Sequence, residues 1–264
     1  MRLAVAQIIT GADPAANLEL IREYATRAKA AGAELVVFPE AAMRAFGNNL
    51  SDIAEPLDGP WAGAVRSIAK ELDIAVVAGM FTPGEGGRVR NTLLVTGPGI
   101  GTSYDKIHLF DAFGFAESDS VDAGTSPVTF ELNGTVIGLA TCYDVRFPAL
   151  FTANARAGAQ VNIVCASWGA GEGKAGQWDL LIRARAVDST TFVVACGQGD
   201  PASMGLPSAA AAPTGIGHSA VISPLGSPIV TLGKEPELAV VDIDPTAVAD
   251  VRAKLPVLAN ARSL

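Results

Sequence analysis

Apolar runs and helical periodicity alternate along the first part of the chain. Residues 2–8 form a short β-rich run, and Glu34–Phe38 is apolar after its first residue, which is typical of a strand buried on both faces of a sheet. Between them, Asp13 can cap a helix, Pro14 suits its first turn and Gly32 can end it. The pattern predicts strand, helix and strand in succession.

The same reading predicts the other elements. We expect helices at 60–72, 148–157 and 177–188 and from residue 245, and strands at 74–81, 91–96, 101–106, 128–132, 135–141, 161–167 and 192–196. Strands at 219–222, 229–232 and 239–243 are expected to form a closing antiparallel set, and 200–217 a long surface loop. Asn133-Gly134 is a strong hairpin signal. This order predicts an α/β layered sandwich with mixed sheets and outer helices.

Composition limits the class of protein. The chain has 264 residues, 49% hydrophobic and 17% charged, which suits one large domain spanning residues 1–264. Its net charge of -8 would repel phosphate backbones, so we expect no nucleic-acid partner. No apolar run is long enough for a bilayer and no charged leader is apparent, so we expect a cytoplasmic protein without membrane contact.

Three polar residues follow predicted strands and could carry chemistry. They are Glu40, Lys106 and Cys142. A cysteine attacks as its thiolate, a carboxylate can take its proton, and an ammonium can hold the negative charge that develops. Cys165 and Cys196 lie within or at the end of apolar strands, where a free cysteine is usually inert. An odd cysteine count also argues against a disulfide framework.

Two other motifs bear on metal and cofactor binding. His108 and His218 are the only histidines, without CxxC or HxxxH spacing, so we expect no metal. Gly171–Gly176 fits G-x-G-x-x-G between a strand and a helix, which leaves a non-catalytic nucleotide-binding or scaffold protein as an alternative. A dinucleotide site would have an acidic residue about twenty positions after Gly176, but that position is Cys196. Ala175 follows Lys174 where a phosphate-binding GK[ST] motif would have serine or threonine. We therefore favour a loop near the mouth of the active site.

Several segments together resemble the nitrilase (carbon–nitrogen hydrolase) superfamily. They are Phe38-Pro39-Glu40, 104–110 (YDKIHLF) and 141–148 (TCYDVRFP), followed by 166–169 (ASWG), 183–186 (RARA) and 217–219 (GHS). The resemblance covers nearly the whole chain in family order. It implies a four-layer α-β-β-α sandwich, a homodimer, and a small-molecule amide as substrate, with no cofactor.

The resemblance also implies a role for each matching residue. Cys142 would attack the amide carbonyl carbon and form a thioester, releasing ammonia or an amine, and Glu40 would be the general base. Lys106 and the backbone N–H of Tyr143 would stabilise the oxyanion. Glu117 would position the lysine or the substrate.

Other positions have more than one interpretation. Tyr104, Asp144 and Arg146 are expected to support the site, with an ion pair between Asp144 and Arg146. Trp168 could line the pocket or be an ordinary core indole. The Cys142 segment is most similar to the branch containing deaminated glutathione amidase and omega-amidase, which implies a carboxylate-bearing amide, although Ala149 replaces the glutamate usual there. N-carbamoyl amide hydrolysis with the same three residues is the enzymatic alternative.

Overall fold

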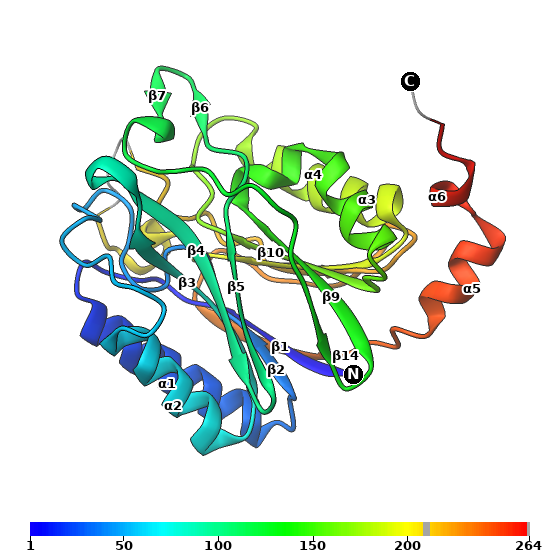
Figure 1. Ribbon diagram of the computed structural model, residues 1–264, viewed down its shortest axis with the longest axis horizontal. Helices are drawn as coiled ribbons and strands as arrows, with labels where there is room; N and C mark the ends of the chain where they lie inside the picture. The colour runs from blue at the N-terminus through cyan, green and yellow to red at the C-terminus, as the bar shows by residue number, and fades with distance from the viewer. Residues whose placement is uncertain (208–211, 263–264) are drawn as a thin grey trace.

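Two six-stranded sheets pack face to face, with helices on their outer sides (Figure 1). The computed structural model describes residues 1–207 and 212–262. The first sheet has the order β14 (Glu237–Asp242), β1 (Arg2–Gln7), β2 (Leu35–Val37), β3 (Ala75–Pro83), β4 (Val89–Gly97), β5 (Ile100–Asp105). The second has the order β13 (Pro228–Thr231), β12 (Ala220–Ile222), β11 (Phe192–Gly197), β10 (Val161–Ala166), β9 (Thr135–Thr141), β8 (Thr129–Leu132).

The helices and short elements complete the sandwich. The α-helices are α1 (Pro14–Ala30), α2 (Pro60–Leu72), α3 (Pro148–Arg156), α4 (Lys174–Ser189), α5 (Ala247–Lys254) and α6 (Val257–Asn260). Short 3-10 helices are η1 (Glu85–Gly87), η2 (Glu117–Asp119), η3 (Cys142–Arg146) and η4 (Pro201–Met204), and β6 (Asp111–Ala112) pairs with β7 (Phe115–Ala116). No helix within the described ranges is long and apolar enough to cross a bilayer.

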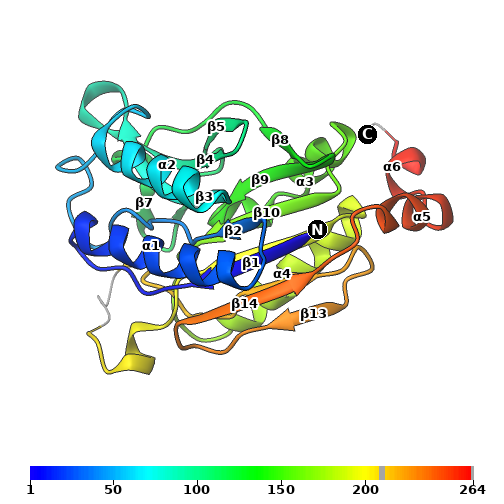
Figure 2. The same ribbon diagram turned by 90° about the horizontal axis from the view of Figure 1, so that it is seen from below.

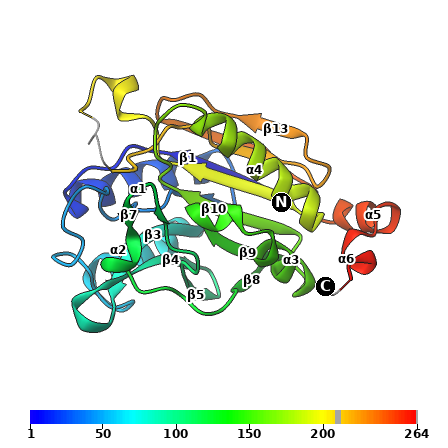
Figure 3. The same ribbon diagram turned by 90° about the horizontal axis from the view of Figure 1, so that it is seen from above.

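The apolar runs are continuous because the strands are covered on both faces. In β1, Leu3 and Val5 join the core between the sheets, whereas Ala4 and Ala6 face the layer formed by α1 and α2. Successive strand residues point to opposite faces, so a strand buried on both sides has no polar alternation. Figure 2 shows α1 and α2 side by side over the first sheet, and Figure 3 shows α3 and α4 over the second.

Most local predictions are confirmed. The side chain of Asp13 caps α1 by accepting from the backbone N–H of Ala15 at 2.9 Å, and α2 spans the expected residues. Asn133 and Gly134 adopt positive φ angles of 49° and 78° in the β8–β9 hairpin. The parallel pairs β1–β2–β3 and β9–β10–β11, flanked by antiparallel strands, make both sheets mixed. The four-layer α-β-β-α architecture is therefore confirmed.

The expected closing antiparallel set is wrong in one respect. β12 and β13 pair with each other, but β14 crosses to the first sheet and pairs antiparallel with β1. The side chain of Gln7 fixes this crossing by donating to the carbonyls of Gly233 and Glu235. The crossing gives β1 a partner on its otherwise open edge. The expected loop at 200–217 contains η4, and residues 208–211 lie outside the described part.

Candidate active site

Four side chains from distant parts of the chain meet between the sheets. The Lys106 Nζ lies 3.3 Å from Glu40 Oε1 and 2.8 Å from Glu117 Oε2. Glu40 is 0% exposed and Lys106 2%, so these charges are out of contact with water. The thiol of Cys142 lies within electrostatic range of Glu40 and Lys106, and its Sγ is 3.9 Å from the carbonyl oxygen of Ser167, whose N–H donates to Glu40. The structure thus brings together the three residues predicted to be catalytic, together with Glu117.

Strand ends deliver each of these residues. Glu40 follows β2 and Lys106 follows β5, both in the first sheet, whereas Cys142 follows β9 in the second. Cys142 has a φ of 48°, a left-handed conformation that costs a non-glycine residue about 1–3 kcal/mol. The sharp turn ends the strand and starts η3 at the sulfur-bearing residue. The cluster therefore depends on both sheets.

A glycine makes room for Glu40. A Cβ added at Gly79 in β3 would lie 2.8 Å from Glu40 Cα and 2.6 Å from the backbone nitrogen of Ala41. The backbone after β2 passes directly over this position, and Ala41 itself has a φ of 58°. The Gly79 carbonyl also accepts the N–H of Met43 at 2.9 Å. Only glycine allows this close approach without a shift of the Glu40 backbone.

Two groups that the sequence did not point to orient the Glu40 carboxylate. Asn91 in β4 donates its amide to Oε1 at 2.7 Å, and the backbone N–H of Ser167 donates to Oε2 at 2.7 Å. The side chain of Gln198 also donates to the Glu40 backbone carbonyl at 3.0 Å. Asn91 could have been noticed as a polar residue in an apolar strand, but a backbone N–H leaves no signal in the sequence.

The electrostatics favour a protonated thiol beside a basic carboxylate. Burial raises the pKa of Glu40, although Lys106 opposes the change. Burial and then the charge of Glu40 raise the pKa of Cys142 well above the usual value for a thiol. Burial alone would lower the pKa of Lys106, but Glu40 and Glu117 outweigh it and raise the pKa. Lys106 is therefore a cation, and Glu40 can accept the thiol proton.

Glu117 holds Lys106 in place. Its two carboxylate oxygens accept from Lys106 Nζ at 3.0 and 2.8 Å, and Oε2 also accepts the backbone N–H of Phe110 at 2.7 Å. A buried ammonium that is held from two sides loses its freedom to swing toward solvent. This geometry fits the positioning role that the family resemblance implies for Glu117.

Asp144 does not pair with Arg146, so the expected ion pair is wrong. The Asp144 carboxylate is fully buried and accepts from the Tyr104 hydroxyl at 2.6 Å and from the Thr141 backbone N–H at 2.8 Å, and it contacts His108 Nδ1 at 2.7 Å. At the third position of η3 the carboxylate folds back toward the start of that helix, as in a capping box. It thereby ties the Cys142 turn to the first sheet.

Arg146 instead extends over aromatic rings. Its guanidinium carbon lies 5.2 Å from the Trp168 ring centroid and 5.8 Å from that of Tyr143, and the group donates to Gln177 Oε1 at 2.8 Å. Trp168 is buried and packs on Trp178 at 5.2 Å between ring centroids, so it is both a core indole and the support for Arg146.

The glycine-rich segment Gly171–Gly176 follows β10, and its last three residues form the start of α4. Gly173 has a φ of 70° and immediately precedes Lys174, where α4 begins. The Lys174 ammonium lies 4.5 Å from the Phe113 ring centroid and 5.7 Å from that of Phe110. Phe110 packs edge-on against Tyr143, the residue after Cys142, so the start of α4 lies near the Cys142 turn. Within residues 1–207 and 212–262, no three His, Cys, Asp or Glu residues gather in a way that could hold a metal ion.

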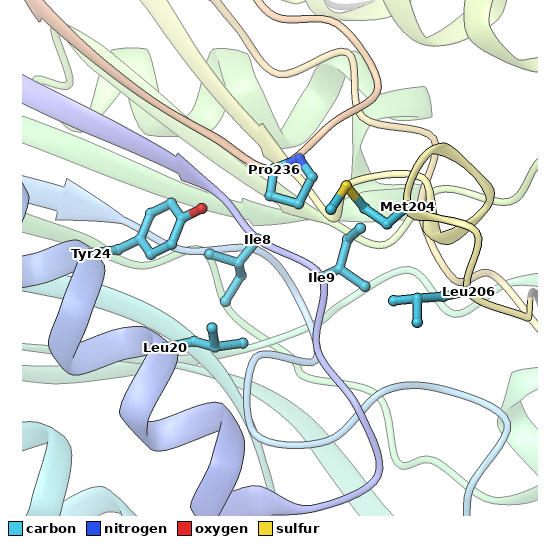
Figure 4. Close-up of a pocket in the computed structure, with 7 residues that line it drawn as sticks. All are labelled: Ile8, Ile9, Leu20, Tyr24, Met204, Leu206 and Pro236. Carbon is cyan, nitrogen blue, oxygen red and sulfur yellow. The ribbon is translucent and has the colours of Figure 1, made fainter.

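A separate groove lies at the other side of β1. It encloses about 270 Å³ and shares no residue with the Glu40–Lys106–Cys142 cluster (Figure 4). Its lining residues are Ile8, Ile9, Leu20, Tyr24, Met204, Leu206 and Pro236. The lining offers mainly apolar side chains and no charged group, so it lacks the means for acid–base chemistry.

Comparison with known proteins decides the family. The carbon–nitrogen hydrolase family model matches residues 2–253. The chain belongs to the carbon–nitrogen hydrolase family. This carbon–nitrogen hydrolase is 55% identical over 266 residues to Hydrolase Rv0480c of Mycobacterium tuberculosis, with 98% of this chain and 95% of the relative covered. The predicted family is thus confirmed.

Two further relatives carry more specific names. The hydrolase is 34% identical over 252 residues to the deaminated glutathione amidase of Escherichia coli O157:H7, with 93% of this chain and 91% of the relative covered. It is 28% identical to a mutant of the amidase from Nesterenkonia sp. AN1, solved with the result of Michael addition of acrylamide at its active site cysteine. That alignment has a TM-score of 0.76 and covers 97% of this chain and 98% of the other.

Proposed function

We propose that this carbon–nitrogen hydrolase is an amidase that cleaves small linear amides through a thioester on Cys142. The observation that carries the proposal is a buried lysine, held between Glu40 and Glu117, with the thiol of Cys142 in electrostatic range of both Glu40 and the lysine. A base, a nucleophile and a fixed cation in one dry site are the parts that acyl transfer requires.

The arrangement accounts for each proton. Glu40 takes the Cys142 proton as the sulfur attacks the carbonyl carbon, and Lys106 and the backbone N–H of Tyr143 hold the oxyanion. Glu40 then gives this proton to the leaving nitrogen as the C–N bond breaks and ammonia departs. Water next attacks the thioester; Glu40 accepts its proton and returns it to the sulfur as the acid is released. The raised pKa of Glu40 suits a group that alternates between base and acid.

The substrate class follows from the relatives and the site together. The likeness to deaminated glutathione amidase supports a small amide that carries a carboxylate at its other end. The acrylamide adduct of the Nesterenkonia amidase supports a nucleophilic cysteine in this fold. We therefore place amides of short dicarboxylic acids first among candidate substrates.

We also infer that the chain works as one domain over residues 1–264 and as a homodimer in the cytoplasm. Leu180 and Val187 on the outer side of α4 are exposed near Leu225 and Ile229 of the β12–β13 hairpin, since Val187 approaches Gly226. A second copy would cover this apolar surface. The free state of all three cysteines suits a reducing compartment. Sedimentation equilibrium of the purified protein tests the dimer, and a monomer at micromolar concentration would refute it.

Ammonia release from a panel of short amides tests the reaction. Wild type should release ammonia, and Cys142→Ala should be at least about a thousandfold slower because no other group replaces the nucleophile. Cys165→Ala is the matched control, since it removes a buried thiol outside the cluster. Equal rates for wild type and Cys142→Ala would overturn the mechanism.

A further inference from the structure

Ser167 bonds to the Glu40 carboxylate and to a segment outside the sheets at the same time. It directly follows β10 and is only 2% exposed. Its backbone N–H donates to Glu40 Oε2 at 2.7 Å, and its hydroxyl donates to the Pro213 carbonyl at 2.5 Å. Its own carbonyl oxygen lies 3.9 Å from Cys142 Sγ. One residue therefore contacts the base, the nucleophile and the segment that contains Pro213.

The two oxygens of the Glu40 carboxylate differ in the donors that they accept. Oε1 accepts the Asn91 amide at 2.7 Å and the Lys106 ammonium at 3.3 Å. Among the N–H groups of residues 1–207 and 212–262, that of Ser167 is the one that donates to Oε2. A carboxylate oxygen has two lone pairs, so Oε1 is filled and Oε2 keeps one for a proton. Because Oε2 and the Cys142 sulfur lie against the same residue, Oε2 is placed to take the thiol proton.

A second support of Glu40 depends on the same segment. Gln198 directly follows β11, and its side-chain amide donates to the Glu40 backbone carbonyl at 3.0 Å. The Gly217 N–H donates to the Gln198 carbonyl at 2.8 Å. Gly215 passes so close that an added Cβ would lie 2.5 Å from that carbonyl oxygen. Residues 213–217 thus hold two groups that fix Glu40 from the side of the second sheet.

The Ser167 N–H also affects the acidity of Glu40. Burial raises the pKa of Glu40, and the Ser167 N–H is one of the groups that oppose this change. The titratable groups that act on the Glu40 carboxyl are Lys106 after β5, Glu117 in η2, Cys142 in η3 and Cys165 in β10. Removal of the Ser167 hydroxyl alters none of these charges. A change in the pKa of Glu40 would therefore measure the hydrogen bond to Oε2.

Building on the amidase function proposed above, we propose that Ser167 is a positioning residue that orients Oε2 of Glu40 toward the Cys142 thiol, and that residues 213–217 hold it in place through its hydroxyl. Oε2 takes the thiol proton as the sulfur attacks the carbonyl carbon, and passes it to the leaving nitrogen as the C–N bond breaks. The orientation of the base is then set in part by a segment that lies outside both sheets.

Ser167→Ala tests the proposal, because it removes the hydroxyl and keeps the backbone N–H. For the amide that wild type cleaves fastest, kcat and kcat/KM should both fall about 5–30-fold with KM unchanged, since a misplaced base weakens only the transition state. The acid limb of kcat/KM should move up by about 0.5–1 pH unit. The reason is that a weaker bond to Oε2 leaves a more basic carboxylate, which takes up its proton at a higher pH.

Ser203→Ala is the matched control. The Ser203 hydroxyl also donates to a backbone carbonyl, that of Asp200 at 2.7 Å, and it lies at η4 in the same connection between β11 and β12. This variant should keep the wild-type rate and acid limb. A Ser167→Ala variant that raised KM alone, or that left the acid limb where wild type has it, would overturn the positioning role.

Pro213→Gly tests the part played by the segment. It keeps the carbonyl that accepts the Ser167 hydroxyl but loosens the backbone that carries this carbonyl. The acid limb should move in the same direction as in Ser167→Ala and by less. Pro213→Gly added to Ser167→Ala should move it no further, because the two changes break one connection. Additive shifts would show that the two residues act on Glu40 separately and would refute the connection.

Infrared spectroscopy makes the test independent of hydrolysis. The band of the protonated Glu40 carboxyl, identified by its absence in Glu40→Gln, should titrate at a higher pH in Ser167→Ala than in wild type or Ser203→Ala. If wild type cleaved no amide yet this difference were present, the proposed reaction would be wrong and the positioning role right. Equal titration midpoints in all three proteins would refute the positioning role and leave the amidase function intact.

Discussion

Gly79→Ala should damage the active site without touching a catalytic side chain. The added methyl carbon would lie 2.6 Å from the Ala41 nitrogen and 2.8 Å from Glu40 Cα. Contact becomes ordinary at 3.4 Å, so the backbone that carries Glu40 must retreat by about 0.8 Å. Both obstructing groups are backbone, which cannot rotate aside as a flexible side chain could. The displacement therefore falls on the general base.

The size of the effect follows from this displacement. A misplacement near 1 Å can cost about a hundredfold in rate, so kcat/KM for amide hydrolysis should fall by roughly that factor. Overpacking of a close-packed core should also lower the free energy of unfolding by about 1–3 kcal/mol. Because a chain of this size remains folded after such a loss, the activity change should be visible in fully folded protein.

Ammonia release and urea unfolding measure the two effects, and Gly101→Ala is the control. Gly101 also lies in a strand of the first sheet, β5, but no atom lies within 4 Å of the place that its added methyl group would occupy. The control should match wild type in both assays. A Gly79→Ala variant with wild-type kcat/KM would refute the idea that Glu40 depends on this close approach.

Three other predictions follow from burial and hydrogen bonding. Iodoacetamide should alkylate Cys142 before Cys165 and Cys196, which are fully buried. The alkylation rate of Cys142 should rise about tenfold per pH unit from pH 7 to 9, because burial raises the pKa of its thiol. Peptide mass spectrometry measures the labelling, and equal labelling of all three cysteines would contradict the prediction. Burial also raises the pKa of Cys165, so only the unfolded chain releases the thiol proton above about pH 9. This group should therefore lower the free energy of unfolding by about 1.4 kcal/mol for each pH unit above that value. Urea titrations should show a shallower fall with pH for Cys165→Ala than for wild type, and equal slopes of unfolding free energy against pH would disprove the prediction. Asp144→Asn should lower the free energy of unfolding by about 1–3 kcal/mol, because its amide N–H would then face a backbone N–H, that of Thr141 or of His108, and an unchanged urea midpoint would speak against this.

The features that could be predicted from the sequence are local ones. The helix at 60–72 and the Asn133-Gly134 turn depend on neighbouring residues, and both are confirmed. The sheet to which β14 belongs is decided by its pairing with β1, whose residues lie 230 or more positions away, and no local pattern encodes that pairing. Periodicity identifies that segment as a strand but cannot assign its partner.

The candidate site divides in the same way. The residue types and strand ends point to Glu40, Lys106 and Cys142, but only the packing of two sheets brings them into contact. The expected ion pair of Asp144 is wrong because opposite charges that are close in sequence need not meet, and η3 turns the carboxylate back toward Thr141. The Ser167 N–H was missed because backbone donors carry no residue signature.

The division of the cluster between the sheets links hydrolysis to the completion of folding. The base and the lysine arrive on one half of the sandwich and the sulfur on the other, and the half that carries the base is finished only when residues 237–242 take their place beside residues 2–7. A chain emerging during synthesis therefore has an incomplete first sheet until residues 237–242 are made. Release of ammonia would then serve as a stringent reporter that both halves have docked.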